Sequence, residues 1–195
     1  MLFRSGCQPS QIDLQLPPTG LATIAIQMMG KDRVDDGAQY FTTPTAATTT
    51  GLTAAVNGVA IVGGAAAVNI TGLNFTLHSN RTGEPVVGAN VISTKTPGRI
   101  LGKGQFTAMF EDATYTTAFA NETELEIIVI LTTDNTATSD FVSFCFPRVK
   151  LMGSANNDGE AGIVQTIPFQ ALRAITCGSG FGNELTTLYI QDSAA

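Results

Sequence analysis

The sequence has few of the groups on which catalysis and metal binding depend. It contains no tryptophan, one histidine and three cysteines in 195 residues. A Ser-His-Asp triad would require the single histidine, His78, and a zinc site would need further ligands beside it. The scattered acidic residues do not supply a nucleophile, a base and an orienting group together. We therefore expect no catalytic residue, no cofactor and no metal site, and a function other than that of an enzyme.

Charged residues are also scarce, at 13% of the chain, whereas hydrophobic residues make up 44%. The charged share is about half that of a typical soluble domain. A domain that stays alone in solution usually carries more surface charge, so this composition indicates a surface covered by partners. A weakly charged monomer is the alternative. The net charge of -6 argues against a nucleic-acid clamp, which needs clustered Lys and Arg.

Long hydrophobic runs are missing too. No apolar stretch reaches the roughly 18 residues of a membrane-spanning helix, and residues 1–6 lack the hydrophobic region of a signal peptide. We expect no membrane partner. The cysteines are far apart and odd in number, which excludes a disulfide framework and favours a reducing compartment. Cys145 stands between Phe144 and Phe146, a pattern that predicts a buried, unreactive thiol.

Strand signals dominate what is present. Residues 11–16 and 21–29, separated by the turn residues 17–20, predict a hairpin. Asn57-Gly58 between apolar flanks predicts a second, two-residue hairpin, and a change of parity at Thr71-Gly72 predicts a β-bulge. Counting these, about nine strands are expected without long helices between them. This pattern favours an antiparallel sandwich or barrel over a parallel α/β sheet. The further strands are expected at residues 100–111, 124–131, 141–151, 163–174 and 185–191.

One short helix is predicted between residues 112 and 121. Asp112 is placed to cap it, Tyr115, Ala118 and Phe119 recur at helical spacing, and Asn121 is placed to end it. The fold class expected is therefore mainly β, an antiparallel β-sandwich or barrel with one short flanking α-helix. We expect residues 1–195 to form a single domain.

Two long loops are predicted within this domain, at residues 31–57 and 78–98. The first begins with charged residues and continues with mostly Thr, Ala, Pro and Gly, and the second is rich in Gly and Pro. Loops of this length are uncommon in compact domains and tend to be functional or disordered. A loop that becomes ordered on a neighbouring copy is one explanation, and a loosely held surface loop is the other.

Arg148 and Lys150 follow Pro147 and alternate with apolar residues. Proline cannot donate to a ladder, so this strand is expected at an edge or to carry a bulge. The two cations are expected either to pair with Glu124 or Glu126, from an adjacent strand or an adjacent copy, or to remain an exposed basic pair.

Several segments occur in a recognisable order. Gly6-Cys7 opens a strand, residues 29–32 end the first hairpin, and residues 70–80, 104–112, 146–151 and 165–172 follow a Thr-rich loop. In this order, across roughly residues 6–175, the chain resembles the major tail tube proteins of long-tailed, siphovirus-like bacteriophages. The resemblance implies two packed antiparallel sheets flanked by a helix. It also implies hexameric rings that stack into a tube through which genomic DNA leaves the capsid.

The resemblance further implies partners and contact residues. The partners are other copies of the chain and other tail proteins, while the tape-measure protein and DNA pass through the lumen without sequence-specific binding. The protein is expected in the virion tail, and in the host cytoplasm during assembly. An acidic lumen would repel DNA phosphates and let the genome slide. Ring stacking is expected on the long loop, at Asp35, Asp36, Tyr40, Phe41, Thr42, Thr43 and Pro44, and subunit contacts at Glu124, Glu126, Arg148 and Lys150.

Two other functions stay open at this point. One is a tube protein of a contractile secretion system or a tail-end ring protein, which belongs to the same structural class. The other is a carbohydrate-binding or adhesion β-sandwich. That function needs an exposed aromatic platform, and the absence of Trp and the presence of only three Tyr count against it.

Overall fold

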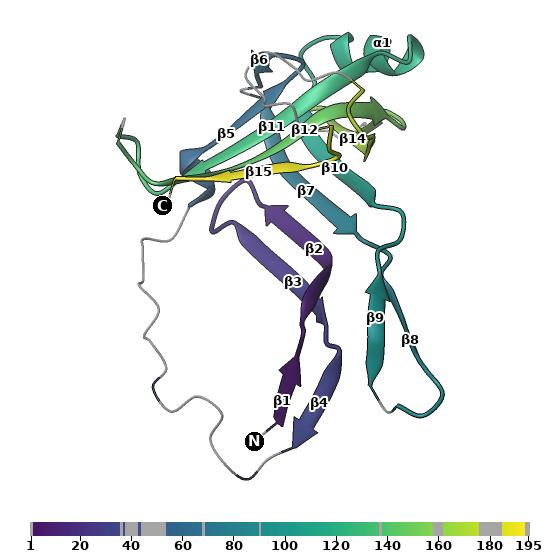
Figure 1. Ribbon diagram of the computed structural model, residues 1–195. Helices are drawn as coiled ribbons and strands as arrows, with labels where there is room; N and C mark the ends of the chain where they lie inside the picture. Colours follow the sequence, from purple (N-terminus) through teal and green to yellow (C-terminus); the bar gives the residue numbers. More distant parts are fainter. Residues whose placement is uncertain are drawn as a thin grey trace.

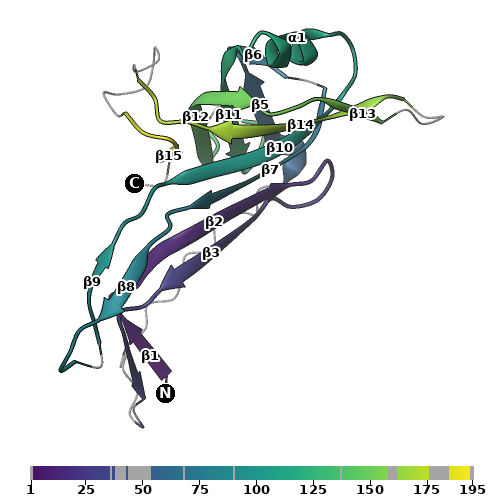
Figure 2. The same ribbon diagram turned by 90° about the vertical axis from the view of Figure 1, so that its right-hand side faces the viewer.

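The computed structural model describes residues 2–35, 37, 43, 54–67, 69–89, 91–136, 138–157, 162–175 and 185–193. These residues form antiparallel strands and one short α-helix, which confirms the predicted mainly β fold class (Figure 1). Most strands belong to one eleven-stranded sheet, whereas two separate sheets were expected. The sheet curls over, so that its later strands pack against its earlier ones (Figure 2).

The main sheet has the order β3-β2-β7-β10-β14-β12-β11-β5-β6, with β13 paired to β14 and β15 to β12. Neighbouring strands are antiparallel throughout. Their bounds are β2 (Gln8–Leu16), β3 (Thr23–Met29), β5 (Gly58–Val62), β6 (Ala65–Ala66), β7 (Ile70–His78), β10 (Leu101–Met109), β11 (Glu124–Thr132), β12 (Phe141–Leu151), β13 (Ala155–Asn157), β14 (Val164–Ala171) and β15 (Tyr189–Asp192).

Two short ribbons extend from one end of this sheet. β1 (Leu2–Ser5) pairs with β4 (Asp32–Asp35), and β8 (Thr82–Pro85) pairs with β9 (Ile92–Thr96). Figures 1 and 2 show both ribbons below the strands β2, β3, β7 and β10, away from the rest of the molecule. The Lys95 ammonium group of β9 donates to the backbone carbonyls of Gly6 and Met29, the latter at 2.9 Å. The second ribbon is therefore tied to the chain around the first.

The core lies where β7, β10 and β14 face β11 and β12. Its centre is a group of buried aromatic rings. Phe75 meets Phe146 edge-to-face with 4.8 Å between ring centroids, and Phe146 meets Phe169 at 5.8 Å. Edge-to-face pairs at these distances are favourable beyond their burial. The alternation of apolar residues along these strands places all of these rings on one face.

Helix α1 (Thr114–Ala120) covers one end of this core. Tyr115 packs edge-to-face on the buried Phe106, with 5.2 Å between the ring centroids. The helix begins slightly later than predicted, because Ala113 is the N-cap residue. Asp112 still accepts a hydrogen bond from the Thr114 backbone N–H at 2.8 Å, and hydrogen bonding by the side chain and the backbone of Thr114 lowers the pKa of its carboxyl group. Asn121 ends the helix as predicted.

The hairpin predicted at Asn57-Gly58 is wrong, whereas the bulge at Thr71 is confirmed. Residues Ala55–Asn57 form a short 3-10 helix, η1, before β5. The Asn57 side chain donates to the Thr133 carbonyl, and the Asn57 carbonyl accepts from the Thr132 hydroxyl. These contacts to the end of β11 override the local turn preference. In the β7–β10 ladder, Gly72 and Ile70 face consecutive residues of β10, so Thr71 is the extra residue.

The two long loops predicted at 31–57 and 78–98 are partly strands. Asp32–Asp35 is β4, and residues 82–85 and 92–96 are the β8–β9 ribbon. Neither ribbon has an alternating apolar face of the kind that marks a strand packed on a core. Their strands are held by backbone pairing with partners that the local sequence pattern does not identify.

Gly104 is expected to tolerate no side chain. A Cβ atom there would lie 2.5 Å from the Asn74 carbonyl oxygen and 2.5 Å from Cζ of the buried Phe169 ring. We expect Gly104→Ala to lower the free energy of unfolding by about 1–3 kcal/mol, the usual cost of overpacking a core. The matched control is Gly153→Ala, whose Cβ would meet its nearest neighbour, Pro168, at 3.7 Å. Thermal unfolding checks this expectation, and equal midpoints for both variants would contradict it.

The Cys145 thiol is buried as predicted, with 2% of the residue exposed, and burial raises its pKa to about 12. The thiolate is the reactive form, so at pH 8 only about one Cys145 side chain in ten thousand is reactive. Cys7 is exposed. We expect iodoacetamide at pH 8 to modify Cys7 at least one hundred times faster than Cys145 in dispersed subunits, as measured by peptide mass spectrometry. In urea the two rates are expected to converge; equal rates in the folded protein would show that Cys145 is accessible.

Candidate assembly interface

Strand β3 leaves one edge of the main sheet open. It pairs with β2 on one side, and no other described strand pairs with its outer side. Such an edge presents a row of backbone N–H and C=O groups that another chain can complete. Proteins that remain monomeric usually protect an edge with proline or charged residues. The sequence of β3, TIAIQMM, contains neither.

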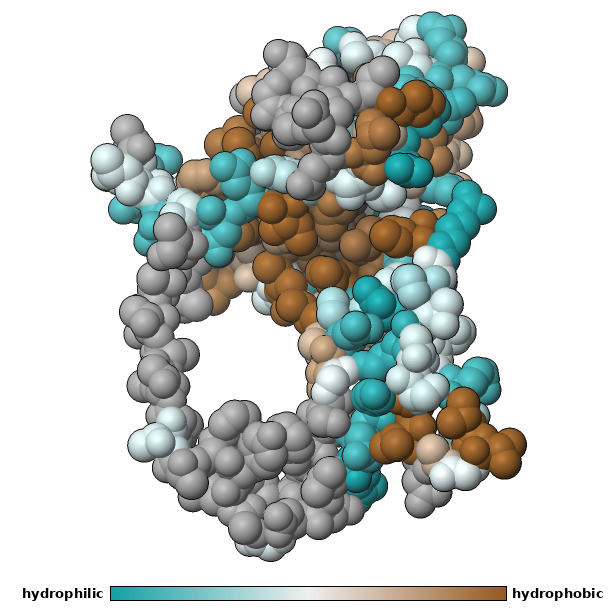
Figure 3. All heavy atoms as spheres, viewed as in Figure 1, coloured by the Kyte–Doolittle hydropathy of each residue, from teal (hydrophilic) through white to brown (hydrophobic). Residues whose placement is uncertain are grey.

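The core-facing side of β3 is apolar and about half exposed. Ile24, Ile26 and Met28 are 47%, 56% and 50% exposed. Ile24 is paired with the fully buried Leu14, so both lie on the face of the sheet that packs on the core. The apolar face therefore continues beyond the strands that cover it. Figure 3 shows hydrophobic residues gathered between the upper strands and the ribbons on this side of the molecule.

The free-energy cost of exposing these apolar side chains to water favours their burial against another chain. Complete burial of a large aliphatic side chain is worth roughly 1.5–3 kcal/mol, and each of these three side chains still shows about half of its surface to water. A strand added along β3 would satisfy the open backbone groups and cover part of the apolar strip at the same time. We call β3 with Ile24, Ile26 and Met28 the open edge.

The opposite face of the same strands is polar. Residues lie across β3, β2, β7 and β10 in three rows, which we call the polar face. These rows are Gln27–Gln11–His78–Leu101, Ala25–Asp13–Thr76–Lys103 and Thr23–Gln15–Asn74–Gln105. One layer of strands thus carries an apolar face toward the core and a hydrogen-bonding face away from it.

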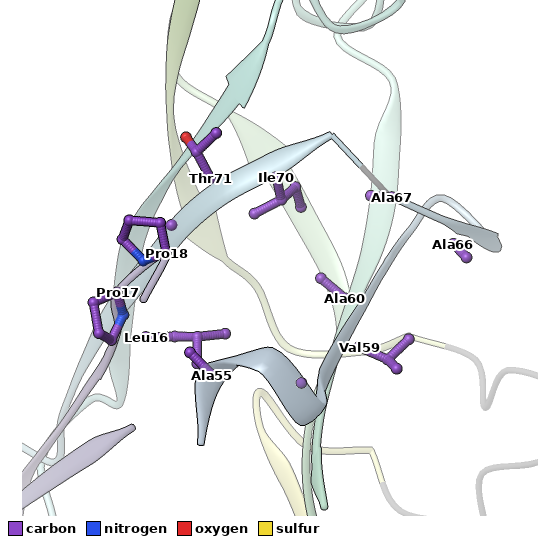
Figure 4. Close-up of a pocket in the computed structure, with 12 residues that line it drawn as sticks. Leu16, Pro17, Pro18, Ala55, Val59, Ala60, Ala66, Ala67, Ile70 and Thr71 are labelled. Atoms are coloured by element: carbon purple, nitrogen blue, oxygen red, sulfur yellow. The ribbon is translucent and has the colours of Figure 1, made fainter. Parts of the chain in front are cut away.

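An apolar pocket of about 230 Å³ lies between the β2–β3 turn, β5, β6 and the start of β7 (Figure 4). Its lining includes Pro17, Pro18, Val59 and Ile70. The lining residue with a polar side chain is Thr71, whose hydroxyl donates to the Thr107 side chain and carbonyl. The pocket offers hydrophobic contact and no acid or base.

The four predicted subunit-contact residues lie on the neighbouring strands β11 and β12. Arg148 donates from Nε and Nη2 to the Glu124 carboxylate at 2.7 and 2.6 Å within one chain. The hydrogen bond from Arg148 lowers the pKa of the Glu124 carboxyl group. Lys150 instead contacts Glu122 at 3.1 Å, which the sequence did not predict. The exposed, unpartnered basic pair is therefore wrong, and a role of Glu124, Glu126, Arg148 and Lys150 between subunits stays a prediction.

The predicted ring-stacking residues are mostly outside the described part of the chain. Asp35 is the last residue of β4, and Thr43 is exposed. Asp36, Tyr40, Phe41, Thr42 and Pro44 lie outside the described residues. Their role in stacking stays a prediction.

No group of three or more His, Cys, Asp and Glu side chains in the described residues is arranged to hold a metal ion. None of the helices within the described ranges has the length and hydrophobicity of a membrane span.

A family model described as phage tail tube protein matches residues 2–171 of the chain. The chain belongs to the phage tail tube protein family. This confirms the resemblance seen in the order of the sequence segments. The family is a structural one and not a class of enzymes. Membership places the tail tube protein in the virion tail, where it assembles with further copies and with other tail proteins.

Among solved structures, the tail tube protein is similar to the SPP1 tail tube determined by solid-state NMR and cryo-electron microscopy. The two chains are 14% identical, the match covers 83% of this chain and 72% of that chain, and the TM-score is 0.33. No curated protein sequence matches this chain.

Sequence reasoning missed the open edge of the tail tube protein. It placed a strand at residues 21–29 but assigned no contact role to Ile24, Ile26 or Met28. A signal was available, because this strand is apolar on one face, lacks charge and follows a hairpin turn. What the sequence did not reveal is that, among the described residues, no later strand covers that face.

Proposed function

We propose that this tail tube protein forms hexameric rings that stack into the tail tube, the conduit for ejection of genomic DNA. The observation that supports this most directly is the open edge. It combines a strand edge that no other described strand pairs with and an apolar strip that is about half exposed, in a chain whose family builds tubes.

Ring closure follows from head-to-tail pairing. A contact between two different surfaces of identical subunits gives a ring when the rotation closes. In this ring the open edge of each subunit adds to the sheet of the next. The strands of all subunits then continue around the lumen as one barrel, which removes every edge.

Stacking uses the segments at residues 31–57 and 78–98. The β1–β4 and β8–β9 ribbons extend together from one end of the subunit (Figure 2). The tip of the second ribbon carries Val86 and Val87, which are 50% and 107% exposed. Exposed aliphatic residues at a protruding tip are suited to contact the next ring. The tape-measure protein and DNA pass through the lumen without sequence-specific binding, and assembly takes place in the host cytoplasm.

Negative-stain electron microscopy and sedimentation of the purified protein at high concentration test this proposal. Long smooth tubes with a regular ring repeat are expected, with or without tail-initiating partners. Single rings that never stack would favour a tail-end ring protein. Material that stays monomeric even when the initiating partners are supplied would refute the proposal, and glycan binding by such a monomer would favour an adhesion domain.

A further inference from the structure

We infer that the polar face lines the lumen of the tube and offers passing DNA a nearly uncharged surface of amides and hydroxyls. This inference rests on the proposed tube. It concerns the chemistry of the lumen and differs from the acidic lumen that was expected with the family resemblance.

The arrangement of layers decides which face points inward. Strands β5, β11 and β12 and helix α1 all lie on the core side of the β7–β10 layer (Figure 2). When sheets from several subunits close into a barrel, the circumference available to each subunit grows with distance from the axis. The bulky covering layer fits outside the barrel, where there is room for it. The polar face, which none of these covering elements overlies, is then left toward the axis.

The exposure of the side chains agrees with this arrangement. Gln15, Gln27, Asn74, Lys103 and Gln105 are exposed in the subunit. On the opposite face of the same strands, Leu14, Leu73 and Phe75 are buried.

The polar face carries almost no net charge. It contains one aspartate, Asp13, and one lysine, Lys103, with no glutamate or arginine, and these two lie in the same row on either side of Thr76. The Gln11 amide donates to both carboxylate oxygens of Asp13, at 2.9 and 2.7 Å. The chain as a whole has a net charge of -6. Its excess of acidic residues is therefore located away from these rows.

A ring repeats this row once per subunit, so equal numbers of Asp13 and Lys103 charges alternate at the same height. Asp13 and Lys103 are two strand spacings apart, roughly 9.6 Å. This is close to the Debye length of about 10 Å at 0.1 M salt, so the net potential along the axis is small. Clustered cations would bind phosphates and hold the genome, and an acidic wall would resist its entry. Amides and hydroxyls bind a layer of water that can exchange hydrogen bonds with passing phosphates. Such a surface neither retains the DNA nor repels it.

Cysteine accessibility tests which face is inside. Asn74→Cys and Gln105→Cys place thiols on the polar face, and Thr117→Cys places one on the exposed surface of α1. Each is made in a background with Cys7→Ser and Cys177→Ser. In tubes, a polyethylene-glycol maleimide is expected to label the two polar-face thiols at least tenfold less than it labels dispersed subunits. Thr117→Cys is expected to react equally in both states. If tubes form and all three thiols react alike, the inference is wrong while the proposed function stands; if no tubes form, both fail.

The salt dependence of DNA uptake by the tubes tests whether the surface of the lumen is nearly uncharged. Preassembled tubes are incubated with short duplex DNA between 50 and 300 mM salt, washed, and assayed for retained DNA; these concentrations are about those over which charged contacts change most. Wild-type tubes are expected to admit and release DNA with little dependence on salt. Gln105→Lys is expected to increase DNA retention at least tenfold at the lowest salt, and Gln105→Glu to suppress entry there. Wild-type tubes that exclude DNA at low salt and admit it at high salt would show an acidic lumen and overturn the inference.

Discussion

Tubes of the tail tube protein are expected to disappear when Ile24 and Ile26 are both replaced by glutamate, while the subunit stays folded. Both side chains are about half exposed on β3, at the margin of the core, and their replacement leaves the buried aromatic rings untouched. In the assembled ring, by contrast, the same positions would be covered by the neighbouring subunit. A carboxylate buried without a partner costs several kcal/mol.

The effect on assembly is expected to be much larger than the effect on folding. A loss of about 4 kcal/mol per subunit contact corresponds to a roughly thousandfold weaker association, and every contact around the ring is affected equally. The measurements are sedimentation velocity for assembly, and circular dichroism with thermal unfolding for the fold.

Met152→Glu is the matched control for this double variant. Met152 is 52% exposed, which is comparable to Ile26, but it follows β12 and is remote from β3 in the strand order. Tubes are expected to survive this change. Normal tubes from the Ile24→Glu, Ile26→Glu protein would exclude the open edge as the subunit contact.

Replacing Tyr40 and Phe41 by serine is expected to leave folded subunits and rings but to abolish long tubes. Tyr40 and Phe41 are the aromatic residues of the segment at residues 31–57, which after its charged start consists mostly of Thr, Ala, Pro and Gly. Aromatic residues contribute disproportionately to the energy of protein interfaces, where loss of one commonly costs about 2 kcal/mol or more. Tube length in negative-stain images is the measurement.

Substitution is preferable to deletion in this segment. Strand β4, which precedes it, and η1 with β5, which follow it, lie well apart in the molecule (Figure 1). A shortened connection would pull on both, and a loss of tubes would then have two explanations. Thr48→Ser with Thr49→Ser is the control, since it removes methyl groups from the same segment and keeps its length. Tubes of normal length from the Tyr40→Ser, Phe41→Ser protein would rule out this part of the chain as the stacking element.

Much of the central sheet was predictable from the sequence. Strand β12 has the predicted bounds, and along β11 the buried Ile127, Val129 and Leu131 are at the alternating positions that predicted one face. These strands pack against a core on one face, and therefore apolar residues recur at every second position of their sequence. The bulge at Thr71 was predictable for the same reason, because an extra residue shifts that period.

The sequence predicted that the chain assembles with other copies, but not which residues form the candidate interface. Low charge and the order of family segments indicated assembly with sister copies. The ion pair between Arg148 and Glu124 was among the predicted alternatives. The second predicted cation, Lys150, pairs with Glu122 instead of with Glu124 or Glu126. On a curled sheet, the separation of two residues along the chain does not predict whether their side chains are in contact. For long polar side chains the choice among several nearby partners depends on that local geometry.

By itself, the amino-acid sequence determined the β character of the chain, its core-facing positions, its short helix and its family. All of these depend on residue type and spacing along the chain. Only the tertiary structure decided that β1 meets β4, that β8 and β9 form a ribbon, that Ile24 and Ile26 stay about half exposed, and that Asp13 and Lys103 share one row of a nearly neutral face. These features depend on which strand lies beside which, because pairing between strands brings together residues that no local pattern connects.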